Sequence, residues 1–463
     1  MAKAKKKVLK ITPILVTLNI LVLLLIVLFY TTRLIKYYKK ENGKKGEDTV
    51  LLVDAIKKHQ SYLDETKGLV YDEKSKTYTY KGEVKDNYLF YSGMVFRIVG
   101  IDSEDNIKLV SEDNVSLLYP GFSNGYEKSF VNKWLNSSDE KYSGIYENVL
   151  FNAGGLLNNT NYCMDTIDDV ENIKCEEVNN SYKITLLSLY DYKSAGGKGS
   201  YLNNGTTFYL GTLNSGKLNY VVNESGEISL NQKTARAITI KPVITINSGT
   251  ELISGNGKMD NPYIIEKHEV ATLGDTYVNN IIKINDNNYK VIEINEDKVK
   301  VVSTDVLKDD KGEVSLAFGG SNSEYSSKNT VGKYLNNTFL NSLDVKDSVV
   351  SSNYYVGLLD LNSLDYAKVY NSKVSAKVGM LTIGEMYVNE VSNVFTIFRG
   401  MEATNIINVI NDSGNLFADN ITSKYNVRPA FYLKSDLKVV KGDGSESSPY
   451  ELGVNDEKET KEE

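Results

Sequence analysis

The chain carries two copies of one sequence pattern, and this duplication constrains its fold more than any single residue does. The run KSFVNKWLN at residues 128–136 returns as KNTVGKYLN at residues 328–336. The run IKPVITI at residues 240–246 returns as VRPAFYL at residues 427–433. Each copy ends in a Gly-x-Gly turn followed by Pro-Tyr. Because self-similarity of this kind marks a structural unit that is used more than once, the sequence predicts one domain fold built twice.

Composition places the chain among folded proteins and argues against nucleic acid as a partner. A chain of 463 residues exceeds the limit of about 250–300 residues that one hydrophobic core serves, so we expect two or three domains. The hydrophobic fraction of 41% and the charged fraction of 24% are typical of globular domains. The net charge of -7 argues against nucleic acid, because proteins that bind it usually carry a basic stripe.

Residues 11–32 (ITPILVTLNILVLLLIVLFYTT) contain no charged side chain and predict a transmembrane helix. A helix of this length spans roughly 33 Å, enough to cross a hydrocarbon core of about 30 Å. No small-residue cleavage site follows it, so we expect an uncleaved anchor. Basic residues flank it on both sides, and their balance leaves the orientation open. Since long domains cross largely regardless of flanking charge, we expect a single-pass protein with extracellular C-terminal domains; the alternative is a cytoplasmic protein tethered by its N-terminus.

The two cysteines, Cys163 and Cys175, lie in one polar loop and are the candidate disulfide of the chain. Two cysteines cannot complete a four-ligand zinc site, and neither His59 nor His268 is near them in sequence. Outside the cytoplasm we expect them to pair and to stabilise the loop by about 2–4 kcal/mol. The alternative is a pair of free thiols in a reducing compartment.

Runs of β-branched and aromatic residues, separated by Asn, Asp and Gly, predict a three-stranded meander at the start of each repeat. A short helix follows near residues 129–136 and 330–336, and Ser188 and Thr382 are placed to cap later helical turns. The predicted order is a basic cytoplasmic tail (1–10), the anchor (11–32), a stalk with a short helix at 50–65 and a hairpin at 68–82 (33–86), repeat one (87–265), a linker (266–280), repeat two (281–452) and a disordered charged tail (453–463).

The succession of motifs resembles a repeat domain of bacterial surface proteins that is distantly similar to the formylglycine-generating-enzyme and C-type-lectin-like folds. The motifs that carry the resemblance are Tyr80-Lys-Gly82, Phe96-Arg-Ile-Val99, Trp134-Leu-Asn136, Leu186-Leu-Ser188, Lys241-Pro242 and the stretch from Gly257 to Tyr263. The resemblance covers both repeats. It implies an α+β, β-rich fold, in which the transmembrane helix is followed by two tandem C-type-lectin-like domains, and it implies a role at the cell surface.

Two departures from these families limit what the resemblance implies about chemistry. The reactive cysteine pair of formylglycine-generating enzymes has no counterpart, because Cys163 and Cys175 lie in a loop insert. The lectin calcium motif, Glu-Pro-Asn or Gln-Pro-Asp beside Trp-Asn-Asp, is absent from the sequence. Neither the oxidase chemistry nor the calcium-dependent sugar site therefore carries over to this chain.

No residue pattern predicts a catalytic, metal or cofactor site. The acidic residues of the insert at 165–177 lack EF-hand spacing, and Arg428 and its counterpart Lys241 are interpreted as structural partners of a buried carboxylate or carbonyl. We therefore expect a membrane-anchored bacterial surface protein, not an enzyme, whose duplicated domains bind an extracellular polysaccharide or protein. The alternatives are an envelope enzyme of the formylglycine-generating-like or cell-wall-hydrolase class, and a structural envelope spacer.

Overall fold

The structure is a computed structural model, and it shows that the chain is β-rich, as the sequence predicted. It describes residues 49–112, 115–118, 126–136, 155–231, 237–319, 325–356, 358–359, 372–389, 391–400, 406–411 and 416–453. The chain divides into two compact units, Met1–Thr49 and Val50–Glu463. The predicted basic tail, the anchor at 11–32 and residues 454–463 of the charged tail lie outside the described residues. Among the residues that are described, no helix has the length and apolar character needed to cross a membrane.

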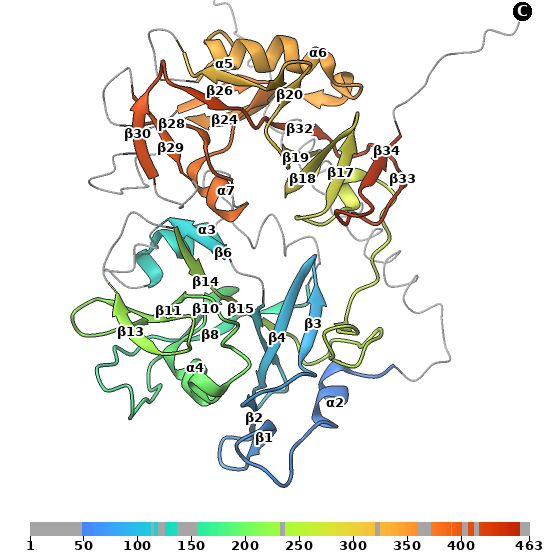
Figure 1. Ribbon diagram of the computed structural model, residues 1–463. Helices are drawn as coiled ribbons and strands as arrows, with labels where there is room; N and C mark the ends of the chain where they lie inside the picture. The colour runs from blue at the N-terminus through green and yellow to red at the C-terminus, as the bar shows by residue number, and fades with distance from the viewer. Residues whose placement is uncertain are drawn as a thin grey trace, which may run out of the picture. The chain divides into compact units, whose positions relative to one another are not determined.

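The N-terminal half, defined as residues 50–265, contains two sheets (Figure 1). The first has the order β16 (Tyr263–Ile264), β3 (Tyr88–Tyr91), β4 (Met94–Ile101), β5 (Ile107–Ser111), β15 (Pro242–Ile246) and β10 (Ile184–Leu186), with β7 (Leu157–Asn158) also on β15 and the hairpin β1 (Gly68–Asp72) and β2 (Thr77–Lys81) also on β4. The second has the order β13 (Ile228–Asn231), β12 (Asn219–Val222), β11 (Phe208–Leu213), β14 (Ala237–Ile240) and β6 (Val115–Leu118). A separate hairpin joins β8 (Thr160–Cys163) to β9 (Val178–Tyr182).

The C-terminal half, defined as residues 281–453, contains the counterparts of these sheets. The first has the order β23 (Val349–Val350), β32 (Ala430–Lys434), β19 (Lys298–Ser303), β18 (Asn287–Ile294), β17 (Ile281–Ile284), β34 (Tyr450–Leu452) and β33 (Val439–Lys441), with β27 (Val378–Gly379) also on β32. The second has the order β22 (Ser315–Ala317), β31 (Lys424–Asn426), β28 (Val394–Gly400), β29 (Ile406–Ile410) and β30 (Leu416–Asn420), with β25 (Leu358–Leu359) on β28. Two further hairpins are β20–β21 (Lys308–Asp309 and Gly312–Glu313) and β24–β26 (Ser352–Val356 and Ser372–Ala376).

The two halves share strand register as well as strand order. The last strand of each half, β16 or β34, pairs in parallel with the first meander strand, β3 or β17. The β4–β5 ladder shifts register between Ile98 and Gly100, and the β18–β19 ladder shifts between Val291 and Glu293, which is the matching place. A β-bulge at the same position in both ladders is part of the fold, because it changes the direction in which the following side chains point. We therefore treat residues at matching register positions as equivalent.

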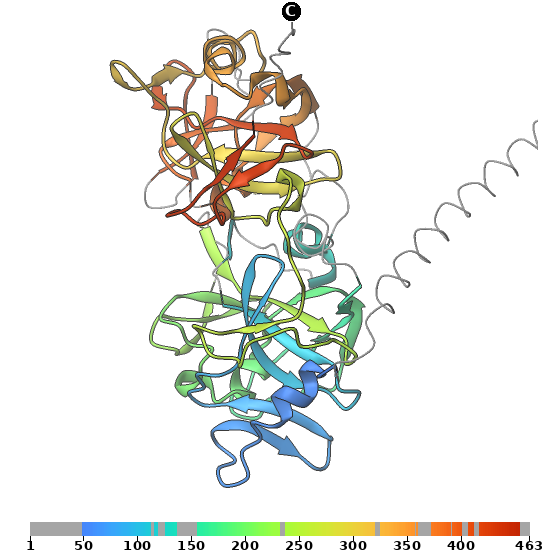
Figure 2. The ribbon, with the colours of Figure 1, turned by 90° about the vertical axis from the view of Figure 1, so that its right-hand side faces the viewer.

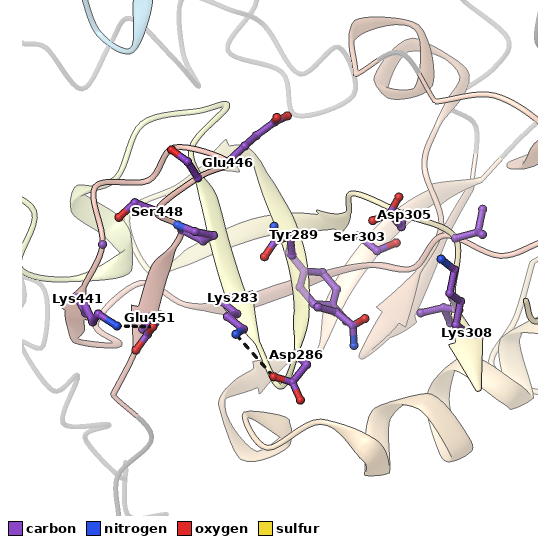
Figure 3. Close-up of a pocket in the computed structure, with 17 residues that line it drawn as sticks. Lys283, Asp286, Tyr289, Ser303, Asp305, Lys308, Lys441, Glu446, Ser448 and Glu451 are labelled. Carbon is purple, nitrogen blue, oxygen red and sulfur yellow. Dashed lines mark hydrogen bonds and ion pairs between the residues drawn. The ribbon is translucent and has the colours of Figure 1, made fainter. Parts of the chain in front are cut away.

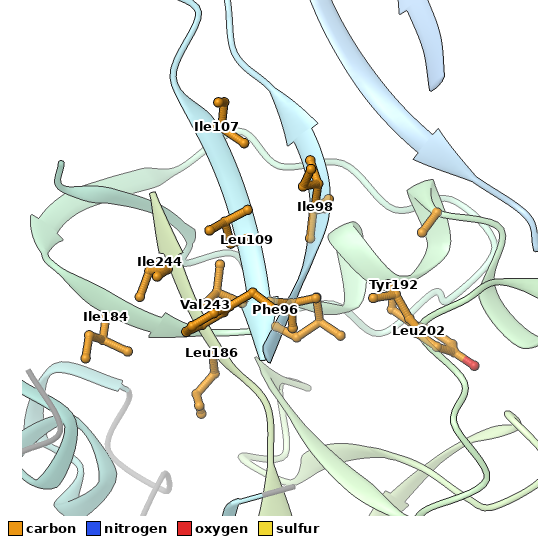
Figure 4. Close-up of a cluster of buried hydrophobic side chains, with 14 of the residues drawn as sticks. Phe96, Ile98, Ile107, Leu109, Ile184, Leu186, Tyr192, Leu202, Val243 and Ile244 are labelled. Carbon is orange, nitrogen blue, oxygen red and sulfur yellow. The ribbon is translucent and has the colours of Figure 1, made fainter. Parts of the chain in front are cut away.

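Each half packs its sheets around its own set of buried apolar side chains. Figure 4 shows this packing in the N-terminal half, where Phe96 and Ile98 from β4 meet Leu109 from β5 and Val243 from β15. The C-terminal half has a separate cluster that contains Val291, Val301 and Phe431 among others. Along β3, buried and partly exposed residues alternate, because successive side chains of a strand point to opposite faces of the sheet. Leu89 and Tyr91 face the core, and their neighbours face outwards.

The helices agree with the predicted positions, with one shortened. The predicted helix at 50–65 is α2 (Leu52–Lys57), which buries Leu52, Val53 and Ile56 in the N-terminal cluster. It ends early because the chain turns and runs beside the predicted hairpin, where Gln60 bridges to Leu69; the views in Figures 1 and 2 agree on this placement. The helices after the meanders are α3 (Phe130–Asn136) and α5 (Thr330–Lys333), and α5 continues into a π-helical stretch (Tyr334–Phe339) and α6 (Leu340–Ser342).

The two predicted helix caps are both present. Ser188 caps α4 (Leu189–Ser194) by accepting a hydrogen bond from the Asp191 N–H, and the Asp191 carboxylate accepts from the Ser188 N–H in return. Thr382 precedes α7 (Ile383–Val388), where its hydroxyl accepts from the Glu385 N–H while Glu385 Oε2 accepts from the Thr382 N–H. Such reciprocal caps satisfy donors that a helix start would otherwise leave without partners.

The capping carboxylates also bind the central sheets. Lys108 Nζ on β5 lies 2.8 Å from Asp191 Oδ1, and Lys300 Nζ on β19 lies 2.5 Å from Glu385 Oε1. The pair in the C-terminal half is the more buried, with side chains that are 6% and 10% exposed. Each pair therefore connects a strand of the first sheet to the start of a helix, at equivalent positions in the two halves.

The repeated Leu-Asn at the end of the first sequence motif serves the backbone of an adjoining strand. Asn136 Nδ2 donates to the Ile184 carbonyl and its Oδ1 accepts from the Ile184 N–H, at 2.8 and 2.9 Å. Asn336 makes the same two bonds to Val378, at 2.9 and 3.0 Å. Each carbonyl also accepts from a tyrosine hydroxyl, that of Tyr126 or Tyr325. The asparagine thus pairs with the first residue of β10 or β27 as a neighbouring strand would.

One position after the bulge distinguishes the halves. Gly100 in β4 pairs with Thr79 of the added hairpin, and a Cβ there would lie 2.3 Å from the Tyr78 carbonyl oxygen. The equivalent residue in β18 is Glu293, which pairs only across to Lys300 among the described strands. The hairpin of the N-terminal half therefore requires glycine at this position, and the C-terminal half can carry a long side chain there.

We predict that Asn136→Ala and Asn336→Ala each lower the free energy of unfolding by about 1–3 kcal/mol, because a strand N–H loses its partner and the strand carbonyl keeps only the tyrosine hydroxyl. Chemical denaturation of residues 50–463 measures the change. Asn337→Ala is the matched control, since Asn337 is exposed and bonds only along its own helix, and we expect a change within about 0.5 kcal/mol. Unchanged midpoints in both test variants would show that these bonds do not hold the strands.

We predict that Gly100→Ala destabilises the chain by about 1–3 kcal/mol, since the new methyl group must displace the Tyr78 backbone. Thermal unfolding followed by circular dichroism measures the effect. Gly199→Ala provides the control, because a Cβ at Gly199 meets no atom within 4 Å. Equal melting temperatures for the two variants would contradict the role given to Gly100.

Candidate functional site

A polar pocket of about 630 Å³ lies in the C-terminal half (Figure 3). Its walls come from β17 and the start of β18, from the chain after β19, and from the turn that joins β33 to β34. Small-molecule sites are usually lined mainly by apolar side chains, whereas this one is lined mainly by Lys, Asp, Glu, Asn and Ser. The lining therefore suits a ligand that presents polar groups over most of its surface.

Two exposed ion pairs line one side of the pocket. Lys283 Nζ lies 3.6 Å from Asp286 Oδ1, and Lys441 Nζ lies 3.2 Å from Glu451 Oε1. Figure 3 shows both pairs, which come from the β17–β18 turn and from the β33–β34 hairpin. Pairs that face solvent contribute only about 0–1 kcal/mol to stability, so their partners can rearrange around a ligand at little cost.

Ser303 lines the opposite side and has a hydroxyl group without a hydrogen-bond partner. The residue is 3% exposed, and within the described parts of the chain no donor or acceptor contacts its Oγ. Its carbonyl oxygen accepts two bonds from Arg428, at 2.9 Å from Nε and 2.6 Å from Nη2. Arg428 therefore has the structural role that the sequence indicated. Burial lowers the pKa of Arg428, and the nearby Asp305 carboxylate acts in the opposite direction.

A buried hydroxyl without a partner costs stability, roughly 1–3 kcal/mol, so its presence at a pocket wall calls for an explanation. The equivalent residue of the N-terminal half, Ser111, makes an interaction within the chain. The hydroxyl of Ser303 lacks such an interaction, and its oxygen is buried behind the pocket wall. Asp305 and Lys308 follow it on the same wall of the pocket (Figure 3).

Part of the matching surface of the N-terminal half, at Phe90 and Gly93, is covered by the chain itself. By register, Phe90 occupies the position of Lys283, and Gly93 occupies that of Asp286. The ring of Phe90 meets the ring of Tyr277 edge-on, with centroids 5.8 Å apart. A Cβ on Gly93 would lie 2.5 Å from Tyr277 Cβ, so glycine is required for this contact.

Polar contacts hold Tyr277 in this position. Glu266 Oε1 accepts from the Ser92 N–H and from the Tyr277 hydroxyl, both at 2.7 Å. His268 stacks on the Tyr277 ring with centroids 3.8 Å apart, and burial lowers the pKa of this histidine. The chain itself thus covers, in the N-terminal half, the positions that correspond to Lys283 and Asp286 of the polar pocket. The sequence reasoning missed this difference, although the change from Phe90 to Lys283 was visible in the repeats.

A second, more open pocket of about 750 Å³ lies in the N-terminal half near the other histidine. His59 Nδ1 lies 2.9 Å from Asp86 Oδ2, and Asp86 lines this pocket. A hydrolytic triad would need a nucleophile on the other side of the imidazole. The described lining contains no serine, threonine or cysteine, so this pocket does not supply one.

Cys163 and Cys175 form a disulfide in the structure, with Cα atoms 5.6 Å apart. Asp165 lies beside them and accepts backbone hydrogen bonds from Glu176 and Glu177 through Oδ2. Within the described ranges, the two sulfurs and this carboxylate are the one cluster of three side chains whose atoms could together hold a metal ion. Because metal ligation requires the thiolate, the disulfide excludes that use and leaves the group as a brace for the acidic insert.

We predict that replacing both cysteines with serine lowers the free energy of unfolding by about 2–4 kcal/mol, because the unfolded loop gains freedom. Denaturation with and without a thiol reductant measures the effect. The parent protein should lose stability on reduction, while the double variant should not respond. A response in the double variant would mean that reduction acts elsewhere.

The comparisons with known proteins add no relative from which to infer a function. No family model, curated protein or solved structure matches the chain. The similarity to formylglycine-generating enzymes and C-type lectins therefore stays an expectation from sequence motifs.

Proposed function

We propose that this chain is a membrane-anchored bacterial surface protein whose C-terminal half binds an extracellular polysaccharide or protein, without catalysis. The observation that carries the proposal is the polar pocket, in which Lys283 and Asp286 stand where the N-terminal half has the covered residues Phe90 and Gly93. Both halves have the same backbone register, so the fold itself does not require a pocket there. A ligand that binds the pocket accounts for the difference.

The charges of the pocket suit a neutral or zwitterionic ligand better than a polyanion. Its lining has three lysines and four carboxylates, which are Lys283, Lys308, Lys441, Asp286, Asp305, Glu446 and Glu451. A phosphate polymer would meet an excess of negative charge there. Sugar hydroxyls and peptide amides both donate and accept hydrogen bonds, so they match a mixture of ammonium, carboxylate, amide and hydroxyl groups.

The location outside the membrane is supported by two features. The apolar stretch at residues 11–32 has the length of a membrane span. The disulfide between Cys163 and Cys175 is a feature of oxidising compartments and is rare in the cytosol. Together they favour display of residues 50–463 on the outer side of the membrane, with the pocket accessible to envelope polymers.

We predict that the fragment 50–463 binds components on a glycan array or in pull-downs from surface extracts, and that Ser447→Trp weakens this binding by about tenfold or more, equal to ~1.4 kcal/mol. Ser447 is exposed at the pocket wall, so the indole fills space without disturbing the core. Titration by calorimetry or surface plasmon resonance measures the affinity.

Asp260→Trp is the matched control, because Asp260 holds the same place in the turn of the N-terminal half and lines the second pocket. We expect it to leave the affinity unchanged. Loss of binding in Asp260→Trp but not in Ser447→Trp would move the site to the N-terminal half. Empty results from both the array and the pull-downs would overturn the proposal and favour a structural spacer.

A further inference from the structure

We propose that Lys300 and Glu385 become joined by an amide bond between lysine Nζ and glutamate Cδ, which gives the C-terminal half an internal covalent cross-link. This inference goes beyond the proposed binding function and does not depend on it. Lys300 Nζ already contacts Glu385 Oε1 at 2.5 Å, between β19 and α7. Glu385 Oε2 accepts from the Thr382 N–H at 2.9 Å, so the carboxyl group is held in one orientation.

A second carboxylate, that of Glu293, belongs to the neighbouring strand on the same face of the sheet. Glu293 is opposite Lys300 in the β18–β19 ladder, and Tyr432 is opposite Lys300 in the β19–β32 ladder. Side chains opposite each other in antiparallel strands have Cβ atoms about 4.5–5.5 Å apart and share one face of the sheet. Glu293 is 8% exposed, and its two oxygens accept from Asn295 Nδ2 at 2.6 Å and from the Tyr432 hydroxyl at 3.1 Å. It is therefore held on the same face of the sheet as the lysine, although no ion pair joins it to Lys300 among the described residues.

Aromatic rings enclose the contact and limit its exposure to water. Lys300 Nζ lies 5.6 Å from the centre of the Tyr354 ring and 5.3 Å from that of Tyr432. Both tyrosines and Lys300 are buried, and the Glu385 side chain is 10% exposed. Amide formation releases a water molecule, so a site that excludes bulk water favours the product and protects it from hydrolysis.

The reaction balances without any oxidant or cofactor. A side-chain rotation that brings Glu293 to Lys300 lets Glu293 take one proton from the ammonium, and the freed nitrogen pair attacks Cδ of Glu385. The new C–N bond forms and one C–O bond of the carboxyl group breaks. The departing oxygen leaves as water with two protons, one returned by Glu293 and one from the same nitrogen. The positive and negative charges of the pair disappear together, and Glu293 ends as it began.

The N-terminal half supplies an internal control. Lys108 and Asp191 form the equivalent contact at 2.8 Å. The residue opposite Lys108 is Gly100, so no second carboxylate stands at that position. Thr245 takes the place of Tyr432 in the neighbouring strand. We therefore expect the cross-link in the C-terminal half alone.

Intact-mass spectrometry of purified, reduced and denatured 50–463 tests the proposal. The expected mass is lower than the sequence mass by one water molecule. Tryptic digestion should then release one branched species that contains Lys300 and Glu385, with no cleavage after Lys300. A folded protein that shows the full sequence mass would overturn the proposal, as would a missing water that maps to other residues.

Variants identify the residues that make the bond. Lys300→Met and Glu293→Gln should each restore the full mass, and Glu293→Gln preserves the size of the side chain, so its fold can be verified by circular dichroism. Lys108→Met is the matched control and should keep the deficit of one water. A deficit that persists in Lys300→Met would assign the bond elsewhere, and one that persists in folded Glu293→Gln would remove Glu293 from the reaction.

Discussion

The register shift in the β4–β5 and β18–β19 ladders is the constraint on which much of the structure depends. It places Lys108 and Lys300 opposite Gly100 and Glu293 on one face of the sheet. From that face Lys108 contacts the carboxylate that caps α4, and Lys300 contacts the one that caps α7. One backbone irregularity, present twice, thus connects the meander to the helix start in both halves.

What stands opposite the lysine then sets the halves apart. The N-terminal half accommodates an extra hairpin, which excludes a side chain at Gly100. The C-terminal half lacks that hairpin among its described strands and carries a buried cluster of Glu293, Lys300, Tyr432 and Glu385. The halves also differ at the β3 and β17 strands. Tyr277 packs against Phe90 in the N-terminal half, whereas a polar pocket opens at the equivalent place in the C-terminal half. Duplication preserved the scaffold, while the chemistry of the two copies diverged.

The sequence predicted those features that depend on neighbours along the chain. Alternating apolar residues and Asn, Asp or Gly turns gave the meanders, and Ser188 and Thr382 gave the helix caps, because these signals act within a few residues. The pocket, the Tyr277 contact and the polar cluster join segments far apart in sequence, so no local pattern revealed them. Asn136 and Asn336 are intermediate: their repetition was visible, but their role needed the position of β10 and β27.

If the chain is anchored at its N-terminus as proposed, the parallel pairing of the last strand with the first meander strand has a mechanical consequence. Pulling on the chain drags β3 toward its start and β16 toward its end, along one common axis. The hydrogen bonds between the two strands are then loaded together in shear, and they do not break one after another as in peeling. The pair β17–β34 has the same arrangement. In each half, the terminal strand pair is therefore loaded in shear, the direction in which it resists force best.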